Sequence, residues 1–124
     1  MDVFEDTMQF REAWRTWADK DEKFIVWFTG AINEQTGESW CPDCVTAKPQ
    51  IDKLVEAGSR HILKGIVVRD EWMGNADHPY KKEANFKAAG VPTLILFEGE
   101  NELHRVDNLD DFANDELMAL FLED

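Results

Sequence analysis

Three short, mainly apolar runs constrain the fold of this chain more than any other feature. They are FIVWF at Phe24–Phe28, ILKGIVVRD at Ile62–Asp70 and VPTLILF at Val91–Phe97. Runs of this kind are typical of strands covered on both faces, and such strands are usually parallel and central. The helical pattern between the first two runs predicts a right-handed βαβ unit. We therefore expect an α/β fold with helices on both faces of a sheet.

The remaining segments predict the helices and strands that complete this sheet. The first helix begins at Asp6 or Thr7, ends at Asp19–Lys23, and has its apolar positions at Met8, Phe10, Ala13, Trp14 and Trp17. Further helices are expected from Pro42 to about Gly58 with a kink at Pro49, from Pro79 to Ala89, and through Leu117, Leu120 and Phe121 after an Asn114 cap. An antiparallel strand is expected at Glu102–Val106 after the turn Glu98–Asn101, and a fifth strand at Val3–Glu5.

Length and charge limit the functions open to this chain. Its 124 residues, 44% of them hydrophobic, favour one domain over residues 1–124. The formal net charge of −13 repels nucleic acid phosphates and anionic lipid, so neither is an expected partner. The acidic first residues lack the apolar core of a secretory signal, and a single cysteine pair is unusual for a secreted disulfide-dependent domain. We therefore expect a cytoplasmic protein.

The only two cysteines, Cys41 and Cys44, stand three positions apart in GESWCPDCVTAKP. A structural zinc site would need further ligands from His61, His78 and His104, whose wide spacing is unlike that of zinc fingers. No metal site is therefore expected. A purely structural disulfide across so short a loop would contribute little stability. A redox couple explains the position better.

Helix geometry predicts different roles for the two thiols. Cys41 precedes Pro42 at the start of the predicted helix, where unpaired backbone N–H groups and the helix dipole stabilise a thiolate. Proline in the first helical turn forfeits no hydrogen bond. Cys44 lies one turn further in and is expected to be more buried. Cys41 is therefore the predicted attacking thiol and Cys44 the resolving thiol.

The motif WCPDC at Trp40–Cys44, a proline five residues beyond it and the distant VPT resemble the thioredoxin superfamily. With FTG and a polar loop before SWCPDC, nearly the whole chain resembles the fourteen-kilodalton thioredoxin-related proteins, the thioredoxin domain-containing protein 17 family. The resemblance implies a thioredoxin fold with a mixed sheet of four to five strands. It also implies a cis peptide bond between Val91 and Pro92 beside the thiols, where the Val91 backbone binds an extended substrate. Otherwise Pro92 would simply start a strand.

The resemblance also implies a function. The chain is expected to be a monomeric dithiol–disulfide oxidoreductase that binds no cofactor and is reduced again by thioredoxin reductase with NADPH. Expected substrates are small disulfides such as cystine, peroxidases and nitrosylated thiols. The alternative is a thioredoxin-fold adaptor that binds a signalling protein, for instance through the loop Thr29–Ser39.

The chain departs from conventional thioredoxins at two places. Conventional thioredoxins have a buried aspartate before the active site that accepts the proton of the resolving cysteine, and Trp27 stands at the matching position here. Asp43 is therefore a candidate proton acceptor for Cys44. The alternative is that Asp43 is only a favourable residue in the first turn of the helix. The loop Thr29–Ser39 is longer than theirs and is expected to narrow the docking surface.

The other aromatic residues and the histidines have structural interpretations. Trp40 is expected to form a flat platform beside the thiols, and Trp72 to lie in an exposed loop. Trp14, Trp17 and Trp27 are expected in the core. The three histidines show no catalytic spacing and are expected to be structural or surface residues.

Overall fold

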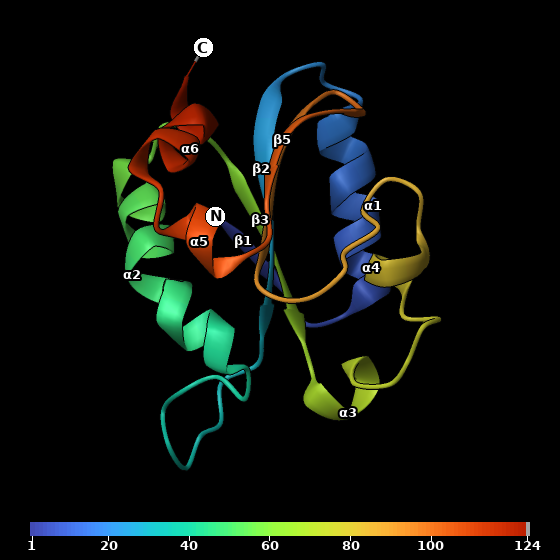
Figure 1. Cartoon of the computed structure of the whole chain (residues 1–124). Helices are drawn as coiled ribbons and strands as arrows, with labels where there is room; N and C mark the ends of the chain where they lie inside the picture. Colours follow the sequence, from blue (N-terminus) through green and yellow to red (C-terminus); the bar gives the residue numbers. More distant parts are fainter. Residues whose placement is uncertain (124) are drawn as a thin grey trace.

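A mixed five-stranded sheet runs through the centre of the computed structural model, which describes residues 1–123 (Figure 1). The strand order is β1-β3-β2-β4-β5. The parallel strands are β1 (Asp2–Phe4), β3 (Ile62–Val67) and β2 (Lys23–Gly30). Strand β4 (Thr93–Glu98) is antiparallel to β2, and β5 (Asn101–Val106) is antiparallel to β4. The predicted sheet is confirmed, including a fifth strand near Val3.

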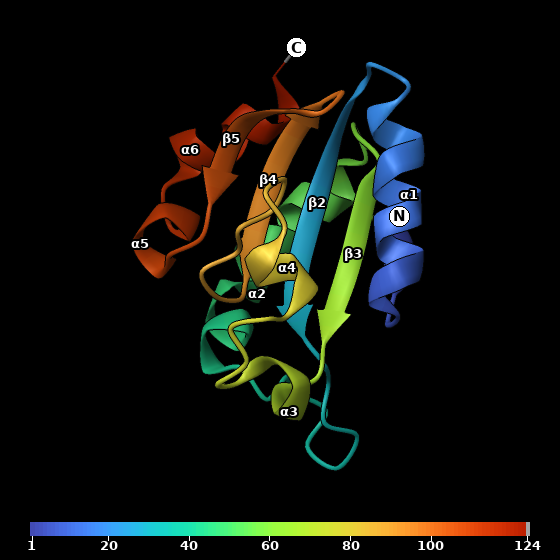
Figure 2. The same cartoon turned by 90° about the vertical axis from the view of Figure 1, so that its right-hand side faces the viewer.

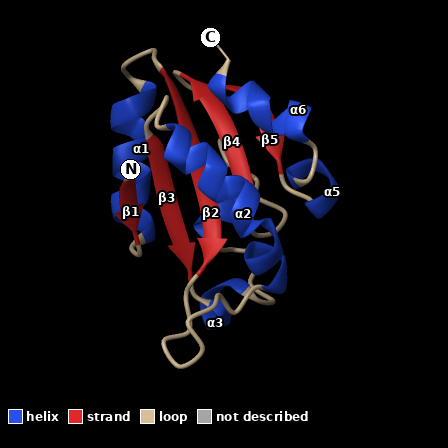
Figure 3. Cartoon of the chain, turned by 90° about the vertical axis from the view of Figure 1, so that its left-hand side faces the viewer, coloured by secondary structure: helices blue, strands red, loops and turns tan. Residues whose placement is uncertain are grey.

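Helices cover both faces of this sheet, as expected. On one face lie α1 (Thr7–Ala18) and the short α4 (Pro79–Lys82), and on the other α2 (Pro42–Ala57), α5 (Leu109–Phe112) and α6 (Asp115–Ala119) (Figure 1, Figure 2 and Figure 3). None of the helices within residues 1–123 is long and apolar enough to cross a membrane.

Strand β2 supplies both halves of the core. Every residue from Phe24 to Gly30 is buried, so the strand extends into the predicted loop by Thr29 and Gly30. Phe24, Val26 and Phe28 join the cluster under α1, while Ile25 and Trp27 join the cluster under α2. This alternation follows from the two-residue period of a strand. The continuous apolar run is therefore explained by burial on both faces.

Local capping explains where α1 begins and where α2 ends. The Asp6 side chain accepts hydrogen bonds from the backbone N–H groups of Met8 at 2.8 Å and Gln9 at 3.0 Å, which confirms the start of α1. Met8 itself is 63% exposed, so its predicted place on the apolar face is wrong. Helix α2 runs unbroken through Pro49 and ends at Gly58, whose φ of 64° is the left-handed conformation that glycine adopts readily.

Strand β3 ends at Val67, before the predicted end at Asp70. The chain then forms the short helix α3 (Arg69–Trp72), in which the Trp72 N–H donates to the Val68 carbonyl at 3.0 Å. Trp72 is only 4% exposed, and its ring lies 4.9 Å from the ring of His78. The expected exposed loop position of Trp72 is therefore wrong, because the α3 turn directs this side chain into the core.

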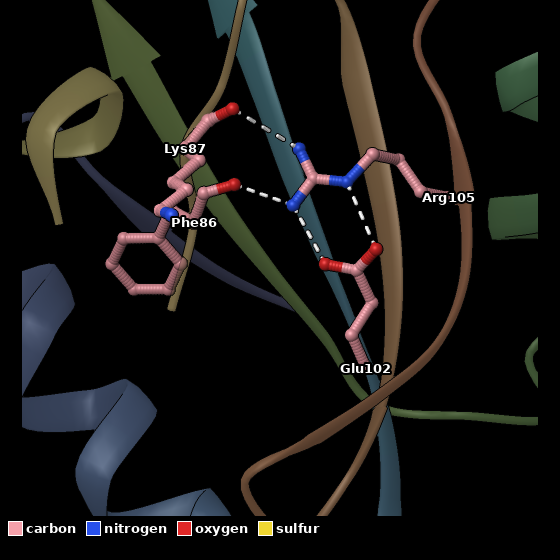
Figure 4. Close-up of polar contacts among 4 residues, drawn as sticks. All are labelled: Phe86, Lys87, Glu102 and Arg105. Atoms are coloured by element: carbon pink, nitrogen blue, oxygen red, sulfur yellow. Dashed lines mark hydrogen bonds and ion pairs between the residues drawn. The ribbon is translucent and has the colours of Figure 1, made fainter. Parts of the chain in front are cut away.

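The prediction of a helix from Pro79 to Ala89 is correct only as far as Lys82. There α4 ends, and Lys87 has a φ of 44° that no α-helix contains. The Arg105 guanidinium, from β5, donates to the carbonyls of Phe86 and Lys87 and is held by both carboxylate oxygens of Glu102 at 2.7 and 3.1 Å (Figure 4). A distant side chain thus satisfies carbonyls that would otherwise need a helical partner.

The last segment of the described chain is less regular than predicted. Asn114 does cap α6, because its side chain accepts from the N–H groups of Glu116 at 3.0 Å and Leu117 at 3.2 Å. The α-helix ends at Ala119, however, and Leu120–Leu122 form a 3₁₀ turn. Helix α5 was not predicted.

Candidate active site

The two cysteines lie at the end of the sheet where the parallel strands β2 and β3 terminate. The loop that follows β2, the start of α2 and helix α3 meet at this end (Figure 2, Figure 3). Ligands and catalytic groups commonly gather outside the carboxyl ends of parallel strands. The fold therefore places the pair where a site is expected.

Both thiols are free, and both sulfurs have backbone partners. The Cys41 Sγ accepts the Cys44 N–H at 3.1 Å and lies 3.3 Å from the Val91 carbonyl oxygen. The Cys44 Sγ accepts the Gly30 N–H at 3.4 Å. Cys41 is 4% exposed and Cys44 is 5% exposed. The two thiols thus do not differ in exposure, contrary to the expectation that Cys44 would be the more buried.

Ionisation of the two thiols is linked through a hydrogen bond between them. The pKa of Cys44 is lowered to about 7, chiefly because the Cys41 thiol donates to it, with smaller contributions from Thr29, Gly30 and Ser39. The same bond, together with burial, raises the pKa of Cys41. One proton therefore leaves the pair more readily than it leaves an isolated thiol.

The two sulfurs face different hollows. Cys41 lines an open groove of about 460 Å³, called here the Cys41 groove, whose walls are Trp40, Cys41, Pro42, Asp43, Arg69, Trp72, Met73, Gly90 and Val91. Cys44 lines a smaller hollow of about 110 Å³, the Cys44 cavity, together with Trp27, Thr29, Lys64 and residues of the loop after β2. A substrate in the groove therefore meets Cys41 first.

Three residues that the sequence did not single out hold the pair in place. Ser39 Oγ donates to the Gly30 carbonyl at 3.0 Å and accepts the Cys41 N–H at 3.1 Å. Thr29 and Gly30, at the end of β2, face Cys44. The only hint in the sequence was the glycine in FTG, where a strand ends and the backbone approaches another group closely.

The expected supporting residues fall on the groove side. Trp40 donates its Nε1 hydrogen to the Val67 carbonyl at 2.9 Å, so its ring forms a fixed wall of the Cys41 groove. The Val91–Pro92 peptide bond is cis, as the resemblance implied. Asp43 is exposed, is the acidic residue in the first turn of α2, and lines the Cys41 groove and not the Cys44 cavity. This position favours the first-turn interpretation of Asp43.

Trp27, which the resemblance places at the position of the buried aspartate, lines the Cys44 cavity. It is buried in the cluster under α2, and the Lys64 ammonium lies 4.3 Å from the centre of its ring. Burial lowers the pKa of Lys64. The Cys44 cavity therefore contains a cation over an aromatic face.

The three histidines are dispersed and have structural contacts. His61 pairs with Asp2 at 3.0 Å, His78 accepts the Tyr80 N–H at 3.2 Å, and His104 contacts the Leu117 carbonyl at 2.9 Å. Within residues 1–123, no group of three metal-ligating side chains is close enough to hold an ion.

Comparison with known proteins identifies the relatives of this chain. The family described as thioredoxin domain-containing protein 17-like, thioredoxin domain, matches residues 4–124. Thioredoxin domain-containing protein 17 of Danio rerio is 33% identical over 111 residues, which cover 85% of this chain and 82% of that protein. A protein of Leishmania braziliensis named acireductone dioxygenase is 35% identical over 79 residues, which cover 58% of this chain. This chain spans only 23% of the length of that relative.

Solved structures show the same architecture. Oxidised thioredoxin O2 from Arabidopsis thaliana matches with a TM-score of 0.64 and 21% identity, covering 98% of this chain and 94% of that one. The fold of this chain is therefore the thioredoxin fold, as the sequence motifs predicted.

Proposed function

We propose that this chain, a member of the thioredoxin domain-containing protein 17-like family, reduces small disulfides such as cystine through Cys41 and Cys44. Membership and fold make it a thioredoxin-like oxidoreductase. The observation that carries the finer proposal is the different surroundings of the sulfurs. Cys41 lines an open groove beside the Val91 carbonyl, whereas Cys44 lines a cavity behind it.

In the first step Cys41 attacks one sulfur of a substrate RS–SR. The pair reacts after it has lost one proton, and the proton that the two sulfurs share stays on Cys44 while Cys41 forms its bond to the substrate sulfur. The S–S bond of the substrate breaks, a Cys41–S–S–R mixed disulfide forms, and RS⁻ leaves. The peptide groups around Val91 supply hydrogen-bonding partners for an extended substrate.

In the second step Cys44 resolves the mixed disulfide. Its proton goes to the departed RS⁻ or to water, and the Cys44 thiolate attacks the Cys41 sulfur. The Cys41–S bond to substrate breaks, a second RS⁻ leaves, and the Cys41–Cys44 disulfide remains. Two electrons have moved from the dithiol to the substrate sulfurs.

Turnover requires an external reductant for the Cys41–Cys44 disulfide. We assign this role to thioredoxin reductase, which draws its electrons from NADPH, with no cofactor on this chain. A reducing cytoplasm fits a single redox-active pair. Peroxidases and nitrosylated thiols are further substrates of the same chemistry, since each presents a sulfur that a thiolate can attack.

The decisive experiment measures reduction and recycling separately. Pre-reduced protein is mixed with cystine and its oxidation is followed directly, and NADPH consumption is then followed after thioredoxin reductase is added, with insulin as the bulky comparison. We expect rapid oxidation by cystine and sustained NADPH consumption. No oxidation of the pre-reduced protein would contradict the disulfide-reductase function, whereas oxidation without NADPH consumption would contradict only the reductant.

Variants of the two cysteines test their roles. Cys41→Ser should abolish reduction, because Cys44 faces the closed side. Cys44→Ser should accumulate a mixed disulfide on Cys41 that mass spectrometry detects. Equal trapping by both variants would show that the roles are misassigned.

A further inference from the structure

We propose that the Cys44 cavity binds a small organic monocarboxylate. Lys64 and the indole N–H of Trp27 hold the carboxylate, and the apolar walls of the cavity hold a short aliphatic body. The cavity lies on the other side of the thiol pair from the Cys41 groove, and the two hollows share no lining residue. A ligand in the cavity and a disulfide in the groove can therefore be bound at the same time. Binding at this site is independent of the proposed disulfide reduction.

One wall of the Cys44 cavity carries a buried hydrogen-bond donor that lacks a partner. Trp27 lines the cavity and is 6% exposed, and its Nε1 has no hydrogen-bond partner among residues 1–123. The indole N–H is a donor only. Buried polar groups are almost always paired, because a buried donor without an acceptor has given up its hydrogen bond to water. An acceptor on a ligand would therefore satisfy Trp27.

The same cavity carries a cation that no carboxylate neutralises. Lys64 is half-buried, and its ammonium lies 4.3 Å from the centre of the Trp27 ring. Within the described chain this ammonium has no ion-pair partner. Burial lowers the pKa of Lys64, and the nearby Lys48 lowers it further, whereas Asp52 raises it. The charged form of Lys64 is therefore destabilised here, and an anion beside it would stabilise it.

One carboxylate can use both donors. The Lys64 ammonium lies over the ring that carries the Trp27 Nε1, so the two donors belong to the same part of the cavity. A carboxylate has two acceptor oxygens, one for each donor. A hydrogen bond to an ionised acceptor is roughly twice as strong as one between neutral groups. A carboxylate therefore fits these donors better than a neutral amide or hydroxyl does.

The volume and the walls of the cavity limit the rest of the ligand. The cavity holds about 110 Å³, less than the roughly 150 Å³ that accommodates one benzene ring. Its apolar walls are the Trp27 ring, Ile32, Val45 and Ile66. A short aliphatic chain fits this space, whereas a nucleotide or a peptide is too large. A small carboxylate such as pentanoate has the required size and polarity.

Charge around the cavity favours one negative charge on the ligand. The charged residues of the lining are Glu38, Lys48 and Lys64. Glu38 and Lys48 are exposed, and Lys48 is already paired with Asp52 at 2.7 Å, so Lys64 is the cation left for a ligand. The net charge of −13 repels anions at a distance, and this repulsion grows with the charge of the ligand. A monoanion therefore gains the contact with Lys64 at the smallest long-range cost.

The test follows the Trp27 indole N–H resonance by ¹H–¹⁵N NMR in the reduced full-length protein at constant ionic strength. Pentanoate is the probe, pentanamide is its uncharged counterpart, and Trp27→Phe assigns the resonance. Pentanoate should shift this resonance saturably, with a dissociation constant in the millimolar range expected for so small a ligand. Pentanamide should bind about 5- to 20-fold more weakly, because it lacks the charge of the acceptor.

Trp14 is the internal control for the resonance. Its Nε1 is also buried without a partner among the described residues, but Trp14 packs under α1 and does not line the Cys44 cavity. The Trp14 indole resonance should therefore stay in place during the titration. Equal shifts of both indole resonances would show a general effect of the solute and would exclude the site.

Two lysine variants test the charge. Lys64→Met keeps a side chain of similar length over the Trp27 ring and should weaken pentanoate binding about 5- to 20-fold, with pentanamide binding nearly unchanged. Lys53→Met is the matched control, because Lys53 is exposed on α2 and lines a different hollow beside α6. It should leave both affinities unchanged. The proposed site is excluded if the parent binds both probes equally, if the Trp27 resonance does not move, or if Lys53→Met weakens pentanoate binding as much as Lys64→Met.

Discussion

Replacing Gly30 with alanine should damage the site more than any other single methyl group added to it. A Cβ at Gly30 would lie 2.6 Å from Ser39 Oγ, 2.9 Å from Trp40 Cε2 and 3.0 Å from Cys41 Cβ. None of these atoms can retreat freely. Ser39 would give up its hydrogen bonds to the Gly30 carbonyl and the Cys41 N–H, and the Trp40 ring is tied to the Val67 carbonyl.

The magnitude follows from these contacts. Forcing an extra carbon into a closely packed site costs about 1–3 kcal/mol, and losing the Ser39 hydrogen bonds adds about 1 kcal/mol. Alanine recovers roughly 0.5–1 kcal/mol because it is less flexible than glycine in the unfolded chain. The net free energy of unfolding should therefore fall by about 1–3 kcal/mol. With a urea dependence of about 1–3 kcal/mol per molar, the midpoint should fall by roughly 1 M.

The assay is urea unfolding of the reduced protein, with Gly90→Ala as the matched control. Gly90 lines the same Cys41 groove, yet a Cβ there meets no atom within 4 Å and its φ is not left-handed. Gly90→Ala should therefore be as stable as the parent or slightly more stable. The thiol pKa should also rise in Gly30→Ala, because the Gly30 N–H that donates to Cys44 is displaced. If the two alanine variants unfold at the same urea concentration, the crowding argument is refuted.

The thiol pair, Asp43 and the polar loop each give one further test. Thiolate absorbance should titrate near pH 7 in the parent. Cys41→Ala should raise the Cys44 pKa, so that the thiolate fraction at pH 7 falls from about one half to roughly a few per cent. An unchanged midpoint would exclude the thiol–thiol hydrogen bond as the cause of the lowered Cys44 pKa. Asp43→Asn should lower the Cys41 pKa by removing a nearby anion, and single-turnover resolution should slow only if Asp43 accepts the Cys44 proton. Deleting Asn33–Thr36 leaves a two-residue hairpin turn with glycine first. The deletion should raise the rate of insulin reduction while the rate of cystine reduction stays nearly unchanged. No gain in insulin reduction at either low or high salt would contradict the steric role of the loop.

The sequence predicted the features that depend on neighbouring residues. Mainly apolar runs predicted strands β2, β3 and β4, because burial on both faces favours apolar residues at successive positions of a strand. Cys41 and Pro42 predicted the start of α2, and Gly58 its end, since caps act within one turn of the chain. The cis bond at Val91–Pro92 came from the family resemblance and not from any local pattern.

Only the tertiary structure decided which groups surround the sulfurs. Gly30 and Ser39 reach the cysteines because β2 ends beside the start of α2, and Arg69 joins the Cys41 groove because β3 stops at Val67. Trp72 looked like a loop residue and is buried.

The predicted helix beyond Lys82 failed for the same reason, since Arg105 supplies the partners for the Phe86 and Lys87 carbonyls from another strand. Periodicity reports whether a segment has a buried face. It carries no information about which distant side chain will meet that face, and the walls of the Cys41 groove are set by such distant contacts.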